Sequence, residues 1–217
     1  MQHIPTLVAM DLEGVFVPEM WVAIADRLQI DELRLTTREV SDYDQLMRMR
    51  LRVLRERSLS LADVQGYVHE SVHPLPGAVE FLNRLRSQTA VIILSDIFYE
   101  FVAPLLPKLN YPTIFCNTLT VDADGMITDY HIRQRDGKRH AIEAFNSLGF
   151  RTFAAGDSYN DLTMIKNAHY GSLFCPPQRI VDEHPELAVA NSYEELRIAI
   201  EGNLFTEAQH SRTAESK

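Results

Sequence analysis

Short apolar runs divide the chain, and polar segments with helical spacing separate most of them. Runs typical of buried strands lie at 6–10, 89–95, 113–116, 151–155 and 171–174. Strands that alternate with helical segments in this way predict an α/β fold with a mainly parallel sheet.

Residues 16–77 interrupt this alternation, because the segment has helical periodicity and contains no strand-like run. Capping-box sequences, with Asp in place of the usual Glu, occur at Ser41–Asp44 and Ser60–Asp63. Three helices are therefore predicted, at roughly 19–29, 42–57 and 61–72. We interpret 16–77 as a helical insert that lies over the edge of the sheet.

The remaining segments complete the predicted core. The turn sequence Asp122–Gly125 lies between two apolar runs, so 116–134 is predicted to form a hairpin beside the sheet. A last helix, capped by Ser192, is expected to end at about Ile200. The polar segment from Gly202 onward is expected to be frayed.

Together these elements predict a Rossmann-like α/β core with a small helical cap inserted after the first strand. We assign 1–15 and 78–205 to the catalytic core, 16–77 to the cap and 206–217 to a tail. A chain of 217 residues can bury a full core, and its length allows one domain or one domain with an insert.

Composition narrows the classes of partner. A formal net charge of -9 argues against general binding to nucleic acid or to anionic membranes, since both require a broad positive surface. The chain has no signal-peptide pattern and no run near the ~18 apolar residues of a membrane helix, so we expect a cytoplasmic protein. Cys116 and Cys175 imply no disulfide framework and are expected to be reduced and buried.

Two acidic clusters follow predicted strands. Asp11 and Glu13 come directly after the first strand, and Asp157 and Asp161 follow the fourth. Ligands of open α/β sheets bind at the carboxyl ends of the strands, where two such loops can face one another. Their oxygen atoms suit a hard cation such as Mg²⁺, so phosphoryl chemistry comes first among the possible functions.

A third loop of this kind carries Ser95 and Asp96, and Lys138 follows Asp136 and Gly137 at a predicted helix start. A single Asp after a strand is usually a helix cap or a turn former, so none of these residues identifies a site alone. The joint occurrence of several acids, a Ser and a Lys at one edge of the sheet indicates a catalytic centre.

The predicted helix 42–57 contains one arginine in an unexpected place. Arg48, Arg52 and Arg55 are typical of a solvated helix face, whereas Arg50 falls inside the apolar stripe, between Leu46 and Leu54. A buried guanidinium without an anionic partner costs several kcal/mol. The partner is either a substrate carboxylate, held bidentately, or a structural salt bridge within the insert.

The order of these motifs resembles that of the haloacid dehalogenase-like phosphohydrolases. The similarity covers nearly the whole chain: an early Asp-x-acid motif, the insert after it, a Ser at a strand end, a Lys and a Gly-Asp-x-x-x-Asp motif. Within that family the chain is most similar to phosphoserine phosphatases. The stretches Asp11–Glu19, Leu94–Glu100 and Ala155–Asp161 are closer still to one branch, the bifunctional phosphoserine phosphatase/phosphoserine:homoserine phosphotransferases.

The resemblance implies a carboxylate nucleophile, Asp11, which splits phosphoryl transfer into two steps through an aspartyl-phosphate. Glu13 would protonate the leaving serine hydroxyl and then activate the acceptor, a role that requires a raised pKa. Ser95 would donate a hydrogen bond to a phosphoryl oxygen.

The resemblance also implies Mg²⁺, held by Asp11, the backbone carbonyl of Glu13 and Asp157. Lys138 would neutralise the charge that develops on the phosphoryl group. Asp161 belongs to the same metal centre, where it would orient Lys138 or a metal-bound water rather than bind the ion directly.

O-phosphoserine is the substrate that the resemblance implies, with homoserine as an acceptor and a homodimer as the assembly. Arg50 would bind the substrate carboxylate and Glu19 the amino group. Asn160 would reach the phosphate or cap the following helix. The full set of expected substrate contacts is Glu19, Tyr43, Met47, Arg50, Ser95, Asp96, Lys138 and Asn160.

One departure from the family pattern affects the chemistry. The usual second acid is Asp, and Glu13 is one methylene longer, while Gly14 stands where phosphoserine phosphatases carry a hydroxyl residue. The acid/base group therefore reaches differently, which allows a bulkier alcohol to compete with water. Two other functions stay open: a phosphatase of another small phospho-metabolite, and a catalytically silent phospho-metabolite-binding protein.

Overall fold

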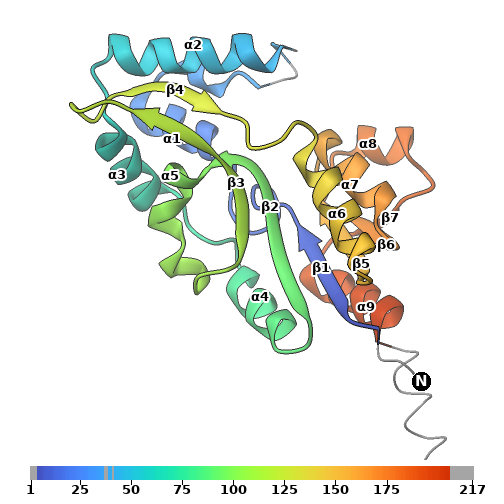
Figure 1. Ribbon diagram of the computed structural model, residues 1–217. Coiled ribbons are helices and arrows are strands. Elements are labelled where there is room, and N and C mark those ends of the chain that lie inside the picture. The colour runs from blue at the N-terminus through green and yellow to red at the C-terminus, as the bar shows by residue number, and fades with distance from the viewer. Residues whose placement is uncertain (1–3, 37–38, 41, 206–217) are drawn as a thin grey trace, which may run out of the picture.

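The computed structural model describes residues 4–36, 39–40 and 42–205. Seven strands in these residues form one sheet in the order β4-β3-β2-β1-β5-β6-β7 (Figure 1). The β3–β4 pair is antiparallel, and the other described pairs are parallel. The strands are β1 (Thr6–Met10), β2 (Ala90–Phe98), β3 (Ile114–Val121), β4 (Ile127–His131), β5 (Arg151–Gly156), β6 (Tyr170–Phe174) and β7 (Ala188–Ala190).

Helices cover both faces of the sheet. Alternate residues of a strand point to opposite faces, and in β1 Leu7 and Ala9 pack with apolar residues of α6, α7 and α8. Val8 and Met10 pack in a second cluster, which includes residues of α4 and α9. The helices are α1 (Met20–Leu28), α2 (Tyr43–Glu56), α3 (Leu61–Ser71), α4 (Ala78–Arg86), α5 (Tyr99–Val102), α6 (Gly137–Ser147), α7 (Leu162–Asn167), α8 (Gln178–Glu183) and α9 (Tyr193–Leu204).

The predicted α/β fold with a mainly parallel sheet is confirmed, and so is the hairpin, formed by β3 and β4. Three larger differences from the prediction concern the end of β2, the existence of β7 and the end of α9. Strand β2 continues to Phe98, three residues past the predicted run. The three-residue strand β7 was not predicted, because it is too short to show a pattern. Helix α9 extends to Leu204, whose side chain is buried in the core, so 202–204 is helical rather than frayed.

The described residues between β1 and α4 form the three predicted helices, α1, α2 and α3, and a short 3₁₀ turn at Asp31–Arg34 that was not predicted. Ser60 and Asp63 form the predicted capping box of α3. Helix α2 is capped by Asp42, which accepts a hydrogen bond from the Gln45 amide, and Ser41 lies outside the described residues. The division into a core and a separate cap domain stays a prediction.

The insert contacts the sheet through the β3–β4 hairpin. Helix α2 runs beside β4 (Figure 1), where the Tyr130 hydroxyl donates to Asp44 Oδ1 at 2.6 Å. The Leu61 amide at the start of α3 donates to the Gly125 carbonyl at the hairpin turn, at 2.9 Å. These hydrogen bonds hold the insert at the β4 edge of the sheet.

Two smaller expectations concern cysteines and membranes. Both cysteines are free, and Cys116 is buried. Cys175 is exposed, because it follows the last residue of β6, so the expectation that both thiols are buried was wrong. None of the described helices has the length and apolar character needed to cross a bilayer.

Candidate active site

Asp11 directly follows strand β1 and therefore lies at the carboxyl edge of the sheet. The Asp11 amide donates to the Ala155 carbonyl at 3.0 Å, which continues the pairing of β1 with β5 for one more residue. The Leu12 amide donates to Asp11 Oδ1 at 2.7 Å. Asp11 is only 5% exposed, so its carboxylate is held in one orientation and is largely shielded from water.

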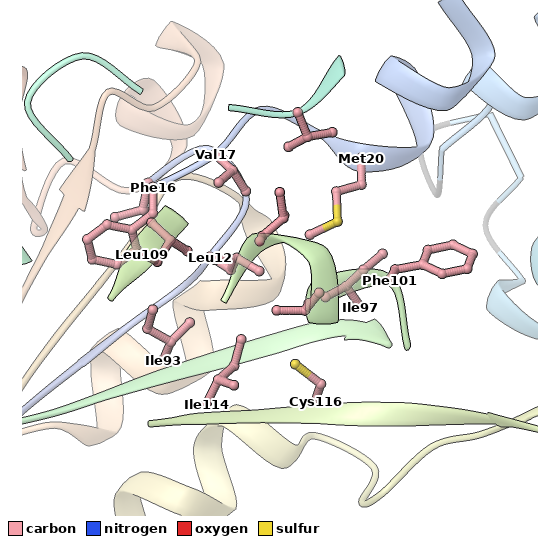
Figure 2. Packing of buried hydrophobic residues seen from close by; sticks show 14 of the residues in the cluster. Leu12, Phe16, Val17, Met20, Ile93, Ile97, Phe101, Leu109, Ile114 and Cys116 are labelled. Atoms are coloured by element: carbon pink, nitrogen blue, oxygen red, sulfur yellow. The ribbon is translucent and has the colours of Figure 1, made fainter. Parts of the chain in front are cut away.

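A tight loop follows Asp11 and is fixed by its apolar side chains. Leu12, Phe16 and Val17 are fully buried in the same cluster as Ile93 of β2 (Figure 2). The Phe16 and Val17 amides both donate to the Leu12 carbonyl, at 2.8 and 3.1 Å. The loop backbone is therefore rigid, although it carries Glu13, the second predicted acid.

Glu13 is placed for proton transfer. Its Oε1 accepts a hydrogen bond from the Met20 amide at the start of α1, at 2.6 Å. Burial, followed by the charge of nearby Glu19, raises the pKa of Glu13 to about 8. The carboxyl group therefore holds its proton at neutral pH, which is the state that a general acid requires.

Lys138, at the start of α6, lies at the centre of the acidic residues. Its Nζ is 2.9 Å from Asp11 Oδ1, 2.7 Å from Asp161 Oδ1 and 3.9 Å from Asp96 Oδ2. Burial acts to lower the pKa of Lys138, but the three carboxylates outweigh it and hold that pKa well above its ordinary value. Lys138 is therefore a buried ammonium ion.

Three carboxylates could hold a metal ion. Oxygen atoms of Asp11, Asp157 and Asp161 lie within 4.8 Å of one another. Burial, followed by the charge of Asp161, raises the pKa of Asp157 to about 7 and raises the pKa of Asp11 well above its usual range. One ammonium cannot neutralise two buried carboxylates and a third, half-buried one, so the donor set fits an additional hard cation such as Mg²⁺.

Two glycines allow the acidic loops to approach the centre closely. A Cβ atom on Gly14 would lie 2.3 Å from Asp157 Cγ, and one on Gly156 would lie 2.2 Å from Asp161 Cγ. Gly14 also has φ +74°, a conformation that favours glycine. Any side chain at either position would displace an acid of the candidate metal site.

Ser95 and Asp96 lie at an irregularity in β2. The β2–β3 register shifts between Leu94 and Phe98, as in a β-bulge, so the strand bends beside the site. Ser95 is buried, and its Oγ accepts a hydrogen bond from the Ile97 amide at 3.4 Å. The bend turns the Asp96 side chain into the cavity, where Oδ2 accepts a hydrogen bond from Asn160 Nδ2 at 3.0 Å.

A cavity of about 420 Å³ connects these groups with the insert. Asp11, Glu13 and Lys138 line it from the core, and Glu19 and Arg50 line it from the insert. The other lining residues are Trp21, Val22, Thr36, Tyr43, Leu46, Asp96, Ile97, Ser158, Tyr159 and Asn160. The catalytic candidates and the cationic Arg50 therefore share one cavity.

Arg50 is buried without a carboxylate partner. Its Nη2 donates to the Leu35 carbonyl at 2.8 Å, and its guanidinium lies over the Trp21 ring at 4.5 Å. Its buried Nε has no hydrogen-bond partner among the described residues. No ion pair to Arg50 occurs in the described part of the chain, so the salt bridge considered above is not found. Burial lowers the pKa of Arg50 to about 10, so it stays charged.

The remaining predicted residues are placed as follows. Glu19 precedes α1 and lines the cavity, as does Tyr43 of α2. Met47 does not line it; its side chain is fully buried and its sulfur lies 3.8 Å from Arg50 Nη1. Ser95 borders a small adjacent recess with Lys138. Asp157 lies behind Gly14, at the metal-binding cluster.

Sequence reasoning missed two residues that shape the site. Trp21 supports Arg50 from another helix, and no sequence spacing links residues on two different helices. Asn117 is a buried polar residue in β3, and its Nδ2 donates to the Asp96 carbonyl at 2.8 Å. An Asn directly after the apolar run Ile114–Cys116 is a signal that could have identified it.

The fold and the acidic centre place this chain in a known class. It matches the haloacid dehalogenase-like hydrolases over residues 6–169, and it belongs to that family. The family resemblance noted from the sequence is thereby confirmed.

Comparison with individual proteins shows a closer similarity than the family match alone. The chain is 47% identical over 191 residues to phosphoserine phosphatase ThrH of Pseudomonas aeruginosa, covering 88% of this chain and 93% of the relative. It is 46% identical to a phosphoserine phosphatase of Pseudomonas syringae pv. tomato, covering 88% and 80%. A solved substrate-bound phosphoserine phosphatase complex superposes with a TM-score of 0.70 at 23% identity, covering 87% and 94%, which supports the fold.

Proposed function

We propose that this protein is a Mg²⁺-dependent phosphoserine phosphatase that acts through an aspartyl-phosphate and can transfer the phosphoryl group to homoserine. The observation that carries the proposal is that the acidic centre and a buried cation share one cavity. Asp11 and Lys138 of the core line it together with Arg50 and Glu19 of the insert. Similarity to proteins named phosphoserine phosphatases supports the same substrate.

The residues around Asp11 fit a magnesium ion. Asp11, the Glu13 carbonyl and Asp157 would hold it, and Asp161 fixes Lys138 beside it. When bound, the ion supplies positive charge that offsets repulsion between the phosphate and the Asp11 carboxylate. Asp161 Oδ1 accepts from Lys138 and Oδ2 accepts from the Ser158 amide, so both of its oxygens are already engaged, which fits a role in positioning the lysine.

In the first step a carboxylate oxygen of Asp11 attacks phosphorus, and the bond from phosphorus to the serine oxygen breaks. Glu13 gives its proton to that oxygen, and serine leaves. In the second step Glu13 takes a proton from water or from the homoserine hydroxyl, whose oxygen attacks phosphorus and releases Asp11. Lys138 stabilises the charge on the phosphoryl oxygens in both steps, and Ser95 donates a hydrogen bond to one of them.

The insert residues that line the cavity suit an amino-acid zwitterion. Arg50 has a free Nε in a buried setting, so a substrate carboxylate would satisfy both its charge and its hydrogen bonding. Glu19 supplies a negative charge to the substrate amino group. Similarity to the bifunctional branch supports a homodimer in the cytoplasm as the working form.

The test is to supply O-phosphoserine and Mg²⁺ with and without homoserine, and to measure free phosphate and phosphohomoserine. Both products are expected with homoserine present. If no phosphohomoserine forms, the protein does not transfer the phosphoryl group to homoserine. If neither product forms, O-phosphoserine is not its substrate.

A second comparison isolates the role of Arg50. Phosphoethanolamine has the amino group and phosphate of O-phosphoserine but no carboxylate. Wild-type protein is expected to prefer O-phosphoserine, while Arg50→Ala is expected to raise the KM for O-phosphoserine and leave that for phosphoethanolamine nearly unchanged. An Arg50→Ala variant with an unaltered KM for O-phosphoserine would show that the carboxylate is bound elsewhere.

A further inference from the structure

We propose that the Asp96 carboxylate is an internal competitor for the phosphate group. It engages the same donors that a phosphate at Asp11 requires, and it thereby weakens the binding of inorganic phosphate and speeds its release. The inference deepens the proposed function, because it concerns the phosphate end of the same site.

The Asp96 backbone is held from two directions. Its carbonyl accepts a hydrogen bond from Asn117 Nδ2 of β3, at 2.8 Å, and one from the Tyr43 hydroxyl of the insert, at 3.5 Å. These contacts fix the main chain at the β2 bend, and the hydrogen bond from Asn160 holds the carboxylate in the wall of the cavity.

The carboxylate contacts donors from two other loops. Its Oδ2 lies 3.0 Å from Asn160 Nδ2, in the loop after β5, and 3.9 Å from Lys138 Nζ, at the start of α6. The same Lys138 Nζ lies 2.9 Å from Asp11 Oδ1. A phosphoryl group bonded to Asp11 must therefore approach the ammonium that Asp96 already contacts.

The charge balance explains why this placement opposes phosphate. Lys138 already faces Asp11 and Asp161, so Asp96 adds a third negative charge around one ammonium. The Asp96 side chain is 51% exposed, so its charge is partly screened. A unit charge a few ångströms from phosphate in such a setting changes its affinity by about tenfold.

Asp96→Asn tests the proposal, because it keeps the shape of the side chain and an oxygen for Asn160 while removing the charge. The dissociation constant of inorganic phosphate for the Mg²⁺-loaded protein is measured by titration calorimetry. It is expected to fall by about tenfold in the variant. The inhibition constant of phosphate and the KM for O-phosphoserine are expected to fall in parallel, with no rise in kcat.

Asp124→Asn is the matched control. It removes the same charge at the exposed hairpin turn, away from the cavity, and is expected to leave phosphate binding unchanged. The difference between Asp96→Asn and wild type is also expected to shrink as ionic strength rises, because the effect is electrostatic. Asp96→Ala serves as a second variant and is expected to change the affinity in the same direction.

Phosphate affinity that is unchanged or weaker in both Asp96 variants would overturn the proposal and make Asp96 an ordinary substrate ligand. This outcome is separate from failure of the proposed function. Tighter phosphate binding in Asp96→Asn would support the role of Asp96 even if O-phosphoserine is not turned over. In that case only the assignment of O-phosphoserine as the substrate would be wrong.

Discussion

Glu13 shows how one residue acquires its chemistry from its surroundings. Its carboxyl group accepts a backbone hydrogen bond from Met20 and lies near the charge of Glu19. The hydrogen bond favours the ionised form, but burial and Glu19 outweigh it and raise the pKa from 4.5 to about 8. This carboxyl group can therefore act as an acid at neutral pH without a histidine.

Glu13→Gln makes the raised pKa measurable. The folded protein binds this proton more tightly than the unfolded chain, so its stabilising effect is complete below pH 4.5 and is lost as pH rises through about 8. Gln keeps an oxygen for the Met20 amide but cannot ionise. In EDTA, the free energy of unfolding of wild type is expected to fall relative to the variant across this window, by about 1 kcal/mol or more.

Urea unfolding at a series of pH values measures this difference, and the variant is also expected to lose nearly all turnover. Parallel stability curves for the two proteins would mean that Glu13 titrates normally.

Gly14 is a second residue whose role is set by its neighbours. Gly14→Ala places a methyl group against Asp157, 2.3 Å from Cγ, and is expected to weaken Mg²⁺ binding by about tenfold or more. Thermal stabilisation by added Mg²⁺ measures this affinity without any substrate. Retained Mg²⁺ affinity would show that Asp157 does not hold the ion.

Gly149→Ala is the matched control for backbone strain. Gly149 has φ +83°, close to the +74° of Gly14, but no atom lies within 4 Å of a Cβ atom added there. Both variants are expected to lose about 1 to 2 kcal/mol of stability from left-handed strain. Only Gly14→Ala is expected to change the response to Mg²⁺.

At the scale of elements, helix α9 supports the catalytic loop from a distance in sequence. The Tyr193 hydroxyl donates to the Val15 carbonyl, two residues after Glu13. The Tyr193 ring stacks between Phe81 and Phe174, with centroids 4.9 and 5.0 Å away. The ring is therefore held in place whether or not its hydroxyl is present.

Tyr193→Phe is expected to remove only the hydrogen bond to Val15. The loss of stability should be about 1 kcal/mol, and kcat should fall several-fold with little change in KM, because the loop that carries Glu13 loosens. Tyr111→Phe, at an exposed tyrosine, is the control. An unchanged kcat in Tyr193→Phe would mean that the apolar packing of Leu12 and Phe16 fixes the loop alone.

Elements with a clear apolar run or helical periodicity could be predicted from the sequence. Element ends that depend on contacts with residues distant in the chain could not. The buried strands β1, β2 and β5 read as continuous apolar runs, and Ser60 marked the start of α3. The end of β2 was missed because its bend depends on pairing with β3. The end of α9 depends on the burial of Leu204, which a polar sequence context concealed.

At the scale of the whole molecule, the insert and the sheet share one apolar cluster. Met47 and Leu51 of the insert belong to the same buried group as Val8 of β1 and Leu196 of α9. The hairpin hydrogen bonds to Asp44 and Leu61 add polar contacts between the two parts. We therefore expect the insert to unfold together with the core.

The single tryptophan tests this expectation, because Trp21 lies in α1 of the insert. Its fluorescence reports on the insert, whereas far-UV circular dichroism reports on all helices. The two signals are expected to give the same urea midpoint, as in a two-state transition. A lower midpoint for fluorescence would show that the insert unfolds as a separate domain.

The convergence of the acidic loops on one centre was predictable, because parallel strands end at the same edge of the sheet. The sequence also identified Arg50 as a buried cation within an apolar stripe. Its stacking on Trp21 and the contact between Asp96 and Asn160 could not be predicted, since each joins segments whose approach depends on tertiary packing. Met47 was expected to contact the substrate, but its side chain is fully buried beside Arg50 and does not line the cavity.

The most direct test of the account is to locate the phosphoryl group during turnover. Protein mixed with O-phosphoserine and Mg²⁺ is quenched in acid and digested, and its peptides are examined by mass spectrometry. One phosphoryl group is expected, on the peptide that contains Asp11, and none is expected in Asp11→Asn, which should also be inactive. Turnover that persists in Asp11→Asn, or a phosphoryl group on another residue, would contradict it.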